Sequence, residues 1–452
     1  MNQGLTIVPP PVVGEALRRL EARGFQAWCV GGCVRDSLLG KAPSDWDIAT
    51  SALPQETKAC FAGERLVEAG AAHGTIAWVP SGGHPIEITT FRSDGAYTDG
   101  RHPDSVAFSR RLEDDLSRRD FTVNAMAWHP QRGLVDLFHG QEDLSAGLLR
   151  CVGEPARRFS EDALRILRCL RFSSQLGFAI HPDTAQALWE KRELLLALSH
   201  ERVREELTKL LCGQGAAAVL RQYAAVVFTV LPELAPMKGC AQETPYHCFD
   251  VWEHTLHAVD YAPQQGDLRW AALLHDAGKP GRKTRSADGV AHFYGHPPES
   301  GRIARQLLTR LRFSNKERDW IAALVVPHED AMPMGEAHLK GLLGRYGERF
   351  VFTLFQLQEA DMSAKAPGVF ARRLPDLEES RALARAILER GDCLTLGDMA
   401  LTGEDLKALG VAPGPEMGKL LRRLLEAVQR GEAANTPAAL GELAKRLLKR
   451  GL

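Results

Sequence analysis

The sequence predicts an α+β fold: a small α/β head with a mixed sheet, followed by an elongated all-helical neck, body and tail. The first 140 residues alternate short apolar runs with Gly and Pro breaks, as strands around one or two helices do. From Ser160 almost to the end, apolar residues recur at i, i+3 and i+4, the spacing of amphipathic helices. At 452 residues, the chain is long enough for two to four such parts.

Four segments of the head are expected to form strands, because each is a short apolar run bounded by turn residues. They are residues 25–32, 74–80, 84–92 and 121–128. The helical pattern that follows is clearest in residues 161–178, 202–213 and 269–279.

Composition places the chain among ordinary globular proteins. Charged residues make up 25% and apolar residues 44%, with a formal net charge of −1, so any nucleic-acid binding has to use local basic patches. No apolar run approaches the roughly 20 residues of a membrane span, and Met1–Gly14 lacks the layout of a signal peptide, so no membrane partner is expected. The nine cysteines form no CxxC pair, which favours a reduced, cytoplasmic location.

The run from residue 30 to 50 carries the strongest chemical pattern. Asp45 and Asp47 are spaced i, i+2, which would put both carboxylates on one face of a strand. Two carboxylates aimed at one point need a cation between them, and Mg²⁺ suits this role. Gly31 and Gly32 carry no Cβ, so the backbone there can approach a phosphate. Alone, each feature is more often an ordinary turn or surface pair; together they indicate nucleotidyl transfer.

Three further residues extend this pattern. Glu87 lies in an alternating segment that fits a neighbouring strand, where it is either a third Mg²⁺ ligand or a solvated strand residue. Arg35 and Asp36 follow the glycine turn at the expected start of a helix, where backbone N–H groups and the helix dipole favour phosphate.

With the segment RRDFTVNA (118–125), these motifs resemble the head domain of the nucleotidyltransferase superfamily, specifically the bacterial CCA-adding tRNA nucleotidyltransferase and poly(A) polymerase group. With the later motifs included, the resemblance covers nearly the whole chain. It implies that Arg119 and Asp120 contact the nucleotide and that Asn124 shapes its pocket. It also implies that residues 91–106 form the flexible loop that complete CCA addition requires.

The segment EDALRILR (161–168) is expected to begin a helix, with Ser160 as its N-cap. A purely structural helix start has the same residues. Asp162 and Arg165 lie three apart, on one helix face, and offer one acceptor and a fork of donors. In the resembled family, the EDxxR pattern selects C and A without a nucleic-acid template.

Two arginines continue this basic face. Arg168 and Arg171 are expected to neutralise phosphates of the nucleotide or of tRNA. The next helix, from Glu201, resembles the signature that supports the neck. Its Glu201, Arg202 and Glu205 are therefore assigned first to structure.

Residues 247–361 hold a second constellation. A lone histidine is more often a core residue, but an adjacent His-Asp pair with one His about twenty residues earlier and an Asp much later resembles the HD phosphohydrolase superfamily. In that family a divalent metal polarises phosphate and activates water; the donor set suits Mn²⁺, Ni²⁺, Fe²⁺ or Mg²⁺ alike. The resemblance assigns one metal to His254, His275, Asp276 and Asp361, and a second, bridged by Asp276, to His296 and His328.

The tail resembles the family's tRNA-contact element. Gly414, Pro415 and Gly418 are expected to open a helix, and residues 411–452 carry eight Lys or Arg against four Glu, a net of +4. These basic residues form either a solvated helix face or a surface that binds tRNA phosphates. The candidate RNA contacts in this helix are Lys419, Arg422 and Arg423.

Together these observations predict an enzyme that builds or repairs the 3′-terminal CCA of tRNA from CTP and ATP. An A-adding enzyme, a poly(A) polymerase and a metal-dependent phosphohydrolase with an RNA-binding head remain open, as does the choice between monomer and homodimer. The expected parts are a catalytic head (1–150), a base-selecting neck (151–220), an HD-type body (221–370) and a tRNA-binding tail (371–452).

Overall fold

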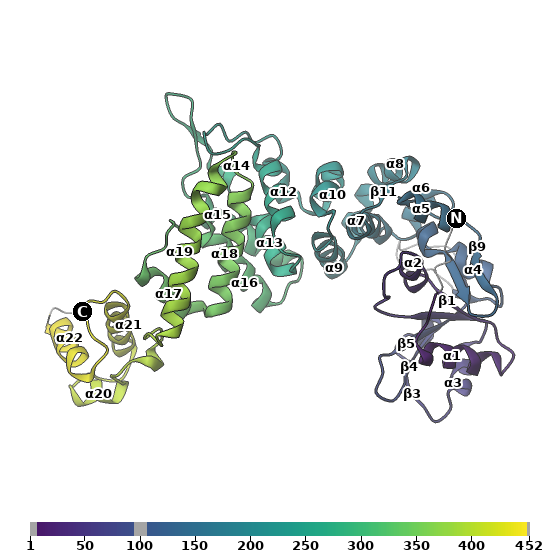
Figure 1. Cartoon of the computed structure of the whole chain (residues 1–452), viewed down its shortest axis with the longest axis horizontal. Coiled ribbons are helices and arrows are strands. Elements are labelled where there is room, and N and C mark those ends of the chain that lie inside the picture. The colour runs from purple at the N-terminus through teal and green to yellow at the C-terminus, as the bar shows by residue number, and fades with distance from the viewer. Residues whose placement is uncertain (1–6, 95–105, 450–452) are drawn as a thin grey trace. The chain divides into compact units, whose positions relative to one another are not determined.

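The computed structural model describes residues 7–94 and 106–449. It contains two compact units, Met1–Pro232 and Glu233–Leu452 (Figure 1). The first unit holds the head sheet and a set of helices, and the second is almost entirely helical. The predicted α+β class is confirmed.

A seven-stranded mixed sheet forms the head, in the order β3-β4-β5-β2-β1-β8-β9. Only β2 and β5 pair in parallel; the other neighbours are antiparallel. Three of the four predicted strands are present as β1, β4 and β5. Of the fourth, predicted over 121–128, only the second half is a strand, β8, because Thr122–Asn124 forms a 3-10 helix. The bounds are β1 (Ala27–Val30), β2 (Asp47–Thr50), β3 (Arg65–Val67), β4 (Thr75–Val79), β5 (Ile86–Thr90), β8 (Met126–His129) and β9 (Gly133–Asp136).

Apolar side chains on the central strands form the core of the head. Trp28 and Val30 of β1 pack with Ala49 of β2 and with Phe91 and Leu116. All four residues of β1 are buried, which fits its place between two other strands. The helices of the head are α1 (Pro11–Glu21), α2 (Gly32–Leu38), α3 (Pro54–Cys60), α4 (Leu112–Ser117) and α5 (Gly140–Ala146).

The segment expected to be a flexible loop, 91–106, is described only at its ends. There β6 (Arg92–Asp94) and β7 (Val106–Phe108) pair in antiparallel fashion. The rest of that prediction, residues 95–105, lies outside the described residues.

The helix expected to begin after Ser160 starts later. Ser160 lies inside α6 (Pro155–Glu161), where its hydroxyl donates to the carbonyl of Ala156, and α7 runs over Leu164–Leu176. The extended backbone of Asp162 separates the two helices, so the N-cap prediction was wrong. Four further helices complete this unit: α8 (Pro182–Lys191), α9 (His200–Leu211), α10 (Ala216–Gln222) and α11 (Ala224–Val230).

The second unit is built from helices with one short hairpin, β12 (Thr284–Arg285) with β13 (Ala291–His292). The first unit also has a two-residue strand pair, β10 (Leu148–Leu149) with β11 (Ala179–Ile180). The prediction that everything after the head is helical was therefore wrong at these short strands. Among the described helices, none is long and apolar enough to cross a membrane. The helices are α12 (Val251–Tyr261), α13 (Gly266–Leu274), α14 (Lys279–Arg282), α15 (His296–Arg310), α16 (Asn315–Val325), α17 (Glu336–Tyr346), α18 (Glu348–Ser363) and α19 (Val369–Glu389).

Three helices at the C-terminal end share a small apolar core. They are α20 (Gly403–Ala408), α21 (Pro415–Gln429) and α22 (Pro437–Lys449). Leu406, Leu420, Leu424 and Leu440 are buried together in this core. As predicted, Gly414 is the N-cap and Pro415 the first residue of α21.

Candidate active site and candidate metal cluster

A cavity of about 770 Å³ in the first unit gathers residues from distant parts of the sequence. Asp45 and Asp47 come from the β2 edge, and the Gly31–Gly32 turn lies between β1 and α2. Most of the other predicted site residues line the same cavity; they are Arg35, Arg119, Asp120, Asn124, Asp162, Arg165 and Arg168.

The two carboxylates do not share a strand. β2 begins at Asp47, and Asp45 precedes it, so the expected i, i+2 strand geometry was wrong although both residues line the cavity. Burial, reinforced by the neighbouring charges of Asp45 and Glu87, raises the pKa of Asp47 to about 6. A carboxylate that is costly to ionise alone is stabilised by a bound cation.

Glu87 lies directly beside this pair. It occupies β5 in parallel register with Asp47 on β2, as the alternating pattern predicted. Its side chain is exposed and is not among the residues that line the cavity. Its negative charge contributes to the raised pKa of Asp47.

The Arg119 guanidinium packs closely against the glycine turn. Gly31 has φ of 78°, and a Cβ there would lie 2.9 Å from the Arg119 guanidinium. On the next helix, Arg35 donates to the Asn124 side chain (2.6 Å) and to Asp36 (2.8 Å). The Gly31 N–H already donates to the Met126 carbonyl (3.3 Å), and the missing Cβ makes room for Arg119. The turn therefore brings two guanidinium groups together, an arrangement suited to a phosphate chain.

Hydrogen bonds to the buried Asp120 fix the positions of basic residues that line the cavity. Arg168 donates two hydrogen bonds to Asp120, at 2.6 and 2.8 Å, and Asn124 donates a third at 3.1 Å. Burial alone would raise the pKa of Asp120, but Arg168 and Asn124 outweigh it and lower that pKa to about 2. Asp115 similarly binds Arg118 (2.5 Å) and Arg119 (3.0 Å).

Asp162 and Arg165 both line the cavity, but not from one helix face as predicted. Asp162 precedes α7, and its Oδ1 accepts the Leu164 N–H (3.0 Å), while Oδ2 lies 3.6 Å from Arg202. Arg165 uses three donors on protein acceptors: the Arg158 and Arg118 carbonyls and Glu161. Two of its N–H groups have no acceptor in the described parts of the protein. Together with the Asp162 Oδ2, they offer a ligand both hydrogen-bond donors and an acceptor.

Arg171 does not continue the basic face. Its guanidinium is buried and lies 3.2 Å from Glu206, so the structure places it in a core ion pair rather than at an RNA-binding surface. The expectation of an exposed phosphate contact at Arg171 was wrong, because α7 turns this side chain toward α9.

Five polar residues of the cavity, besides the apolar Leu164 and Phe172, were not assigned to the nucleotide from the sequence. Arg118 belongs to the nucleotide-binding segment RRDFTVNA but was not itself given a role there, and Arg202 was assigned first to structure. Arg118 had a usable signal, since it is adjacent to Arg119 of the predicted site. The five are His73, Thr75, Arg92, Arg118 and Arg202.

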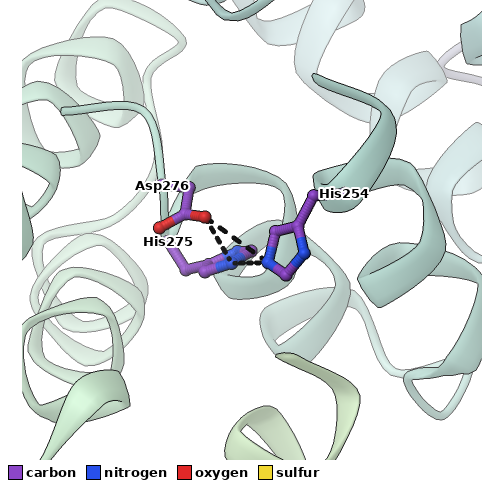
Figure 2. A group of neighbouring side chains, drawn as sticks. All are labelled: His254, His275 and Asp276. Atoms are coloured by element: carbon purple, nitrogen blue, oxygen red, sulfur yellow. Dashed lines mark hydrogen bonds and ion pairs between the residues drawn. The ribbon is translucent and has the colours of Figure 1, made fainter. Parts of the chain in front are cut away.

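A second cluster lies in the Glu233–Leu452 unit. Figure 2 shows the His254 ring converging on the adjacent pair His275 and Asp276. The His254 and His275 Nε2 atoms are 3.4 Å apart, and they lie 3.5 and 3.2 Å from the Asp276 Oδ2. All three side chains are fully buried.

The remaining predicted ligands complete this cluster. Asp361 Oδ1 lies 3.0 Å from the His254 Nε2, and the other Asp276 oxygen lies 3.2 Å from His296 and 3.6 Å from His328. Two ligand groups share Asp276: His254 with His275, and His296 with His328. The structure therefore brings together all six residues that the sequence spacing singled out.

The hydrogen bonds of the four histidines fit metal binding. Each donates its Nδ1–H to a backbone carbonyl: His254 to Ala364, His275 to Ala272, His296 to Phe293 and His328 to Val325. This leaves every Nε2 facing the carboxylates, which is the orientation of a histidine that ligates a metal. The residues present thus fit one or two divalent cations.

Two lysines also contact the cluster. Lys279 lies 2.7 Å from Asp276, and Lys365 lies 2.7 Å from Asp361. Burial opposes ionisation of Asp276, but His275 and Lys279 outweigh it and hold its pKa well below the usual range.

The three tail candidates lie on α21. Arg422 and Arg423 are exposed, and Lys419 pairs with Glu416 at 2.7 Å. Arg422 lines a cavity of about 1110 Å³ with residues of α17 and residues 394–396.

Three family models match the chain. Residues 27–150 match "Poly A polymerase head domain", residues 177–237 match "Probable RNA and SrmB- binding site of polymerase A", and residues 298–444 match "tRNA nucleotidyltransferase domain 2 putative". The first covers the whole of the β1 to β9 region that carries the head cavity.

Curated relatives match almost end to end. The CCA-adding enzyme of Lactobacillus delbrueckii subsp. bulgaricus is 35% identical over 429 residues, covering 94% of this chain and 95% of the relative. That of Limosilactobacillus fermentum is 36% identical, covering 96% of each chain.

The solved CCA-adding enzyme of Bacillus stearothermophilus, in complex with CTP, has a TM-score of 0.75 and 31% identity, covering 98% of this chain and 99% of its own. That of Thermotoga maritima, complexed with tRNA, shares the fold with a TM-score of 0.57 and 21% identity, covering 98% and 97%. The chain therefore belongs to the CCA-adding enzyme family of nucleotidyltransferases.

Proposed function

We propose that this protein adds or repairs the 3′-terminal CCA of tRNA, using CTP and ATP and releasing pyrophosphate. The observation that carries the proposal is the head cavity, where Asp45, Asp47 and the Gly31–Gly32 turn meet Asp162 and Arg165. A transfer site and a base-reading pair thus share one space. Curated relatives named CCA-adding enzyme support the same activity.

The chemistry is nucleotidyl transfer. The tRNA 3′-hydroxyl attacks the α-phosphate of the nucleotide, a new P–O bond forms, and pyrophosphate leaves with the electron pair of the broken bond. Asp45 and Asp47, with Glu87 beside them, would hold Mg²⁺, which supplies Lewis-acid stabilisation of the developing charge. The Arg35 and Arg119 guanidinium groups beside the Gly31–Gly32 turn would receive the triphosphate.

Base choice follows from the donor and acceptor pair. Cytosine and adenine each present an exocyclic N–H donor beside a ring-nitrogen acceptor on the Watson–Crick edge. The Asp162 Oδ2 accepts from the first, and a free Arg165 N–H donates to the second. Uracil and guanine present the opposite order, which leaves buried polar groups unpaired. No nucleic-acid template is then needed.

The test is the sequence of the product. The protein is incubated with tRNA transcripts that end before CCA, after C and after CC, with all four NTPs and Mg²⁺. Completion of CCA on all three, followed by arrest, is expected. Addition only to the CC end would make the protein an A-adding enzyme, and long A tails would make it a poly(A) polymerase.

The division of labour that we propose is a catalytic head (1–150), a base-selecting neck (151–220), a metal-binding body (221–370) and a tRNA-binding tail (371–452). Of these parts, the first two correspond to the Met1–Pro232 unit, and the others to the Glu233–Leu452 unit, within about twelve residues. We expect the protein to work in the cytoplasm, where its tRNA substrate is processed.

We also propose a second activity, a metal-dependent phosphohydrolase of the HD type acting on 2′,3′-cyclic or terminal phosphates. Six buried ligands that share Asp276 favour it, because four histidine Nε2 atoms face two carboxylates there. Water would add to phosphorus while a P–O ester bond breaks, and the leaving oxygen would take the proton. Metal content and hydrolysis of bis-p-nitrophenyl phosphate after loading with Mn²⁺, Ni²⁺ or Mg²⁺ test this proposal.

A further inference from the structure

A cavity of about 550 Å³ opens onto the histidine and aspartate cluster. Asp361 and His328, two of the candidate ligands, form part of its wall. The volume lies within the range of small-molecule sites. A simple phosphate would leave most of this space empty, so the cavity accommodates a larger ligand than the reacting group alone.

Two arginines line the same cavity. Arg372 and Arg373 belong to the first turns of α19 and line the wall. Within the described part of the chain, no side-chain hydrogen bond or ion pair is found for Arg372, and Arg373 has a loose partner in Asp376 at 3.5 Å. Two guanidinium groups without a close carboxylate can both donate hydrogen bonds to a bound anion.

The negative groups of the wall are already engaged. Asp361 is bound by Lys365 at 2.7 Å, and Asp330 is bound by His338 at 2.8 Å. Glu329 lies 3.7 Å from the His296 Nε2. These contacts neutralise the acidic residues locally, so the arginines are the cations that remain for a ligand.

The other residues of the lining suit a nucleoside. Gln358 is 97% buried and lines the cavity; its Nε2 donates to the Pro327 carbonyl, while its Oε1 has no hydrogen-bond partner. A buried amide oxygen without a donor is costly, and a ligand N–H or hydroxyl would satisfy it. Met332 and Met362 offer adaptable apolar contact, and Tyr246 is exposed at the rim.

We propose that this cavity binds a ribonucleoside that carries two phosphates: the reacting phosphate toward Asp361 and His328, and the phosphate on its 5′ side against Arg372 and Arg373. The proposal rests on the phosphohydrolase function proposed above and names its substrate class. The end of an RNA and a free nucleotide with a 5′-phosphate share this chemistry. Gln358 accepts a hydrogen bond from the ligand between the two phosphates.

The first experiment measures kcat/KM of the full-length, metal-loaded protein on four substrates. They are a dinucleotide ending in a 2′,3′-cyclic phosphate, a 2′,3′-cyclic mononucleotide with a 5′-phosphate, the same compound with a free 5′-hydroxyl, and bis-p-nitrophenyl phosphate. The two substrates with a 5′-side phosphate are expected to be favoured about tenfold over the one without it. Equal kcat/KM values for the first two substrates would mean that both an RNA end and a free nucleotide are substrates. A higher kcat/KM for the dinucleotide would identify RNA ends as the preferred substrate.

Arg372→Ala is expected to remove this preference and leave hydrolysis of bis-p-nitrophenyl phosphate unchanged. Gln358→Leu is expected to raise KM for all three nucleotides. Arg385→Ala is the matched control, an exposed arginine of the same helix that is not among the cavity residues. An equal kcat/KM with and without the 5′-phosphate, or an intact preference in Arg372→Ala, would overturn the inference.

Binding separates this inference from the activity on which it rests. Calorimetry compares adenosine 3′,5′-bisphosphate with adenosine 3′-monophosphate, in the wild type and in Arg372→Ala. An Arg372-dependent advantage of the bisphosphate supports the site even if no substrate is hydrolysed, an outcome that would refute the phosphohydrolase proposal alone. No advantage that depends on Arg372 refutes the site itself, whatever the hydrolysis.

Discussion

The two acidic sites of this chain differ in how their carboxylates are satisfied. In the head, Asp45 is exposed and Asp47 half-buried at the wall of an open cavity, with no basic side chain paired to either among the described residues. In the second unit, Asp276 and Asp361 are buried, and each is held by histidines and one lysine.

This difference matches two kinds of binding. We expect the open carboxylates to hold a metal ion that arrives and departs with a nucleotide. The buried cluster fixes its ligands before any ion binds and so favours one that stays. The predictions below test this contrast, from the largest expected effect to the smallest.

Asp47→Ala is expected to lower nucleotide addition at least about a thousandfold, because the Lewis-acid stabilisation it supports is worth several kcal/mol. Incorporation of labelled CTP into tRNA measures this effect. Binding of tRNA and hydrolysis at the second cluster should be unchanged. Glu113→Ala, an exposed acid of the same unit, is the control. Retained addition by Asp47→Ala would remove the metal assignment.

Asp276→Ala is expected to abolish tight metal binding and hydrolysis, because this carboxylate is shared by both ligand groups. Elemental analysis of the purified protein and bis-p-nitrophenyl phosphate turnover measure the two losses. CTP incorporation should stay within about twofold of the wild type, since Asp276 is not part of the head cavity. Asp260→Ala on α12 serves as the control, and unchanged metal content in Asp276→Ala would contradict the shared-ligand arrangement.

Arg165→Ala is expected to lower the preference for C over U by about tenfold to a hundredfold, the cost of losing a paired donor. It should also lower the melting temperature, because Arg165 donates to two carbonyls and to Glu161. Competition between CTP and UTP measures the first effect. Arg157→Ala, an exposed partner of Glu161, is the control. Unchanged selectivity would locate base reading elsewhere.

Asp120→Asn is expected to cost about 2 kcal/mol of stability near neutral pH, because it removes the charge that pairs with Arg168. The folded pKa of Asp120, about 2, lies below the ordinary value of 3.8, so the ionised form stabilises the fold. That contribution is complete above pH 3.8 and is lost as the pH falls toward 2. Urea unfolding of both proteins should therefore differ by a constant amount from pH 7 to 4 and converge at lower pH. A constant difference down to pH 2 would exclude this linkage.

Arg423→Ala is expected to weaken tRNA binding only about threefold and to reduce the slope of log K against log salt by about 0.7 to 0.9, the loss of one phosphate contact. Filter binding at several salt concentrations measures both. An unaltered slope would mean that Arg423 is part of a solvated face, the alternative reading of the basic tail.

The local sequence pattern was sufficient to predict several structural features of this protein. Strands β1, β4 and β5 were predictable because short apolar runs bounded by turn residues are typical of strands. The six cluster residues could be picked out because a His-Asp pair with distant partners is rare by chance, and all six converge. The start of α21 followed from the Gly-Pro dipeptide.

Other features depended on the tertiary structure. Asp45 lies outside β2, and Asp162 lies between α6 and α7, because helix and strand ends are set by packing as well as by local preference. Arg171 is buried because α7 packs against α9, which no i, i+3 spacing reveals. Likewise, only the folded chain brings Arg92, Arg118 and Arg202 to the nucleotide cavity.

By itself, the sequence determined the class of fold and singled out most of the residues that the structure gathers in the two sites, since these depend on residue type and short spacing. The tertiary structure decided which charges face solvent, which pair in the core, and which residues share a cavity. Those outcomes depend on contacts between segments far apart in the chain, and such contacts leave no periodic trace in the sequence.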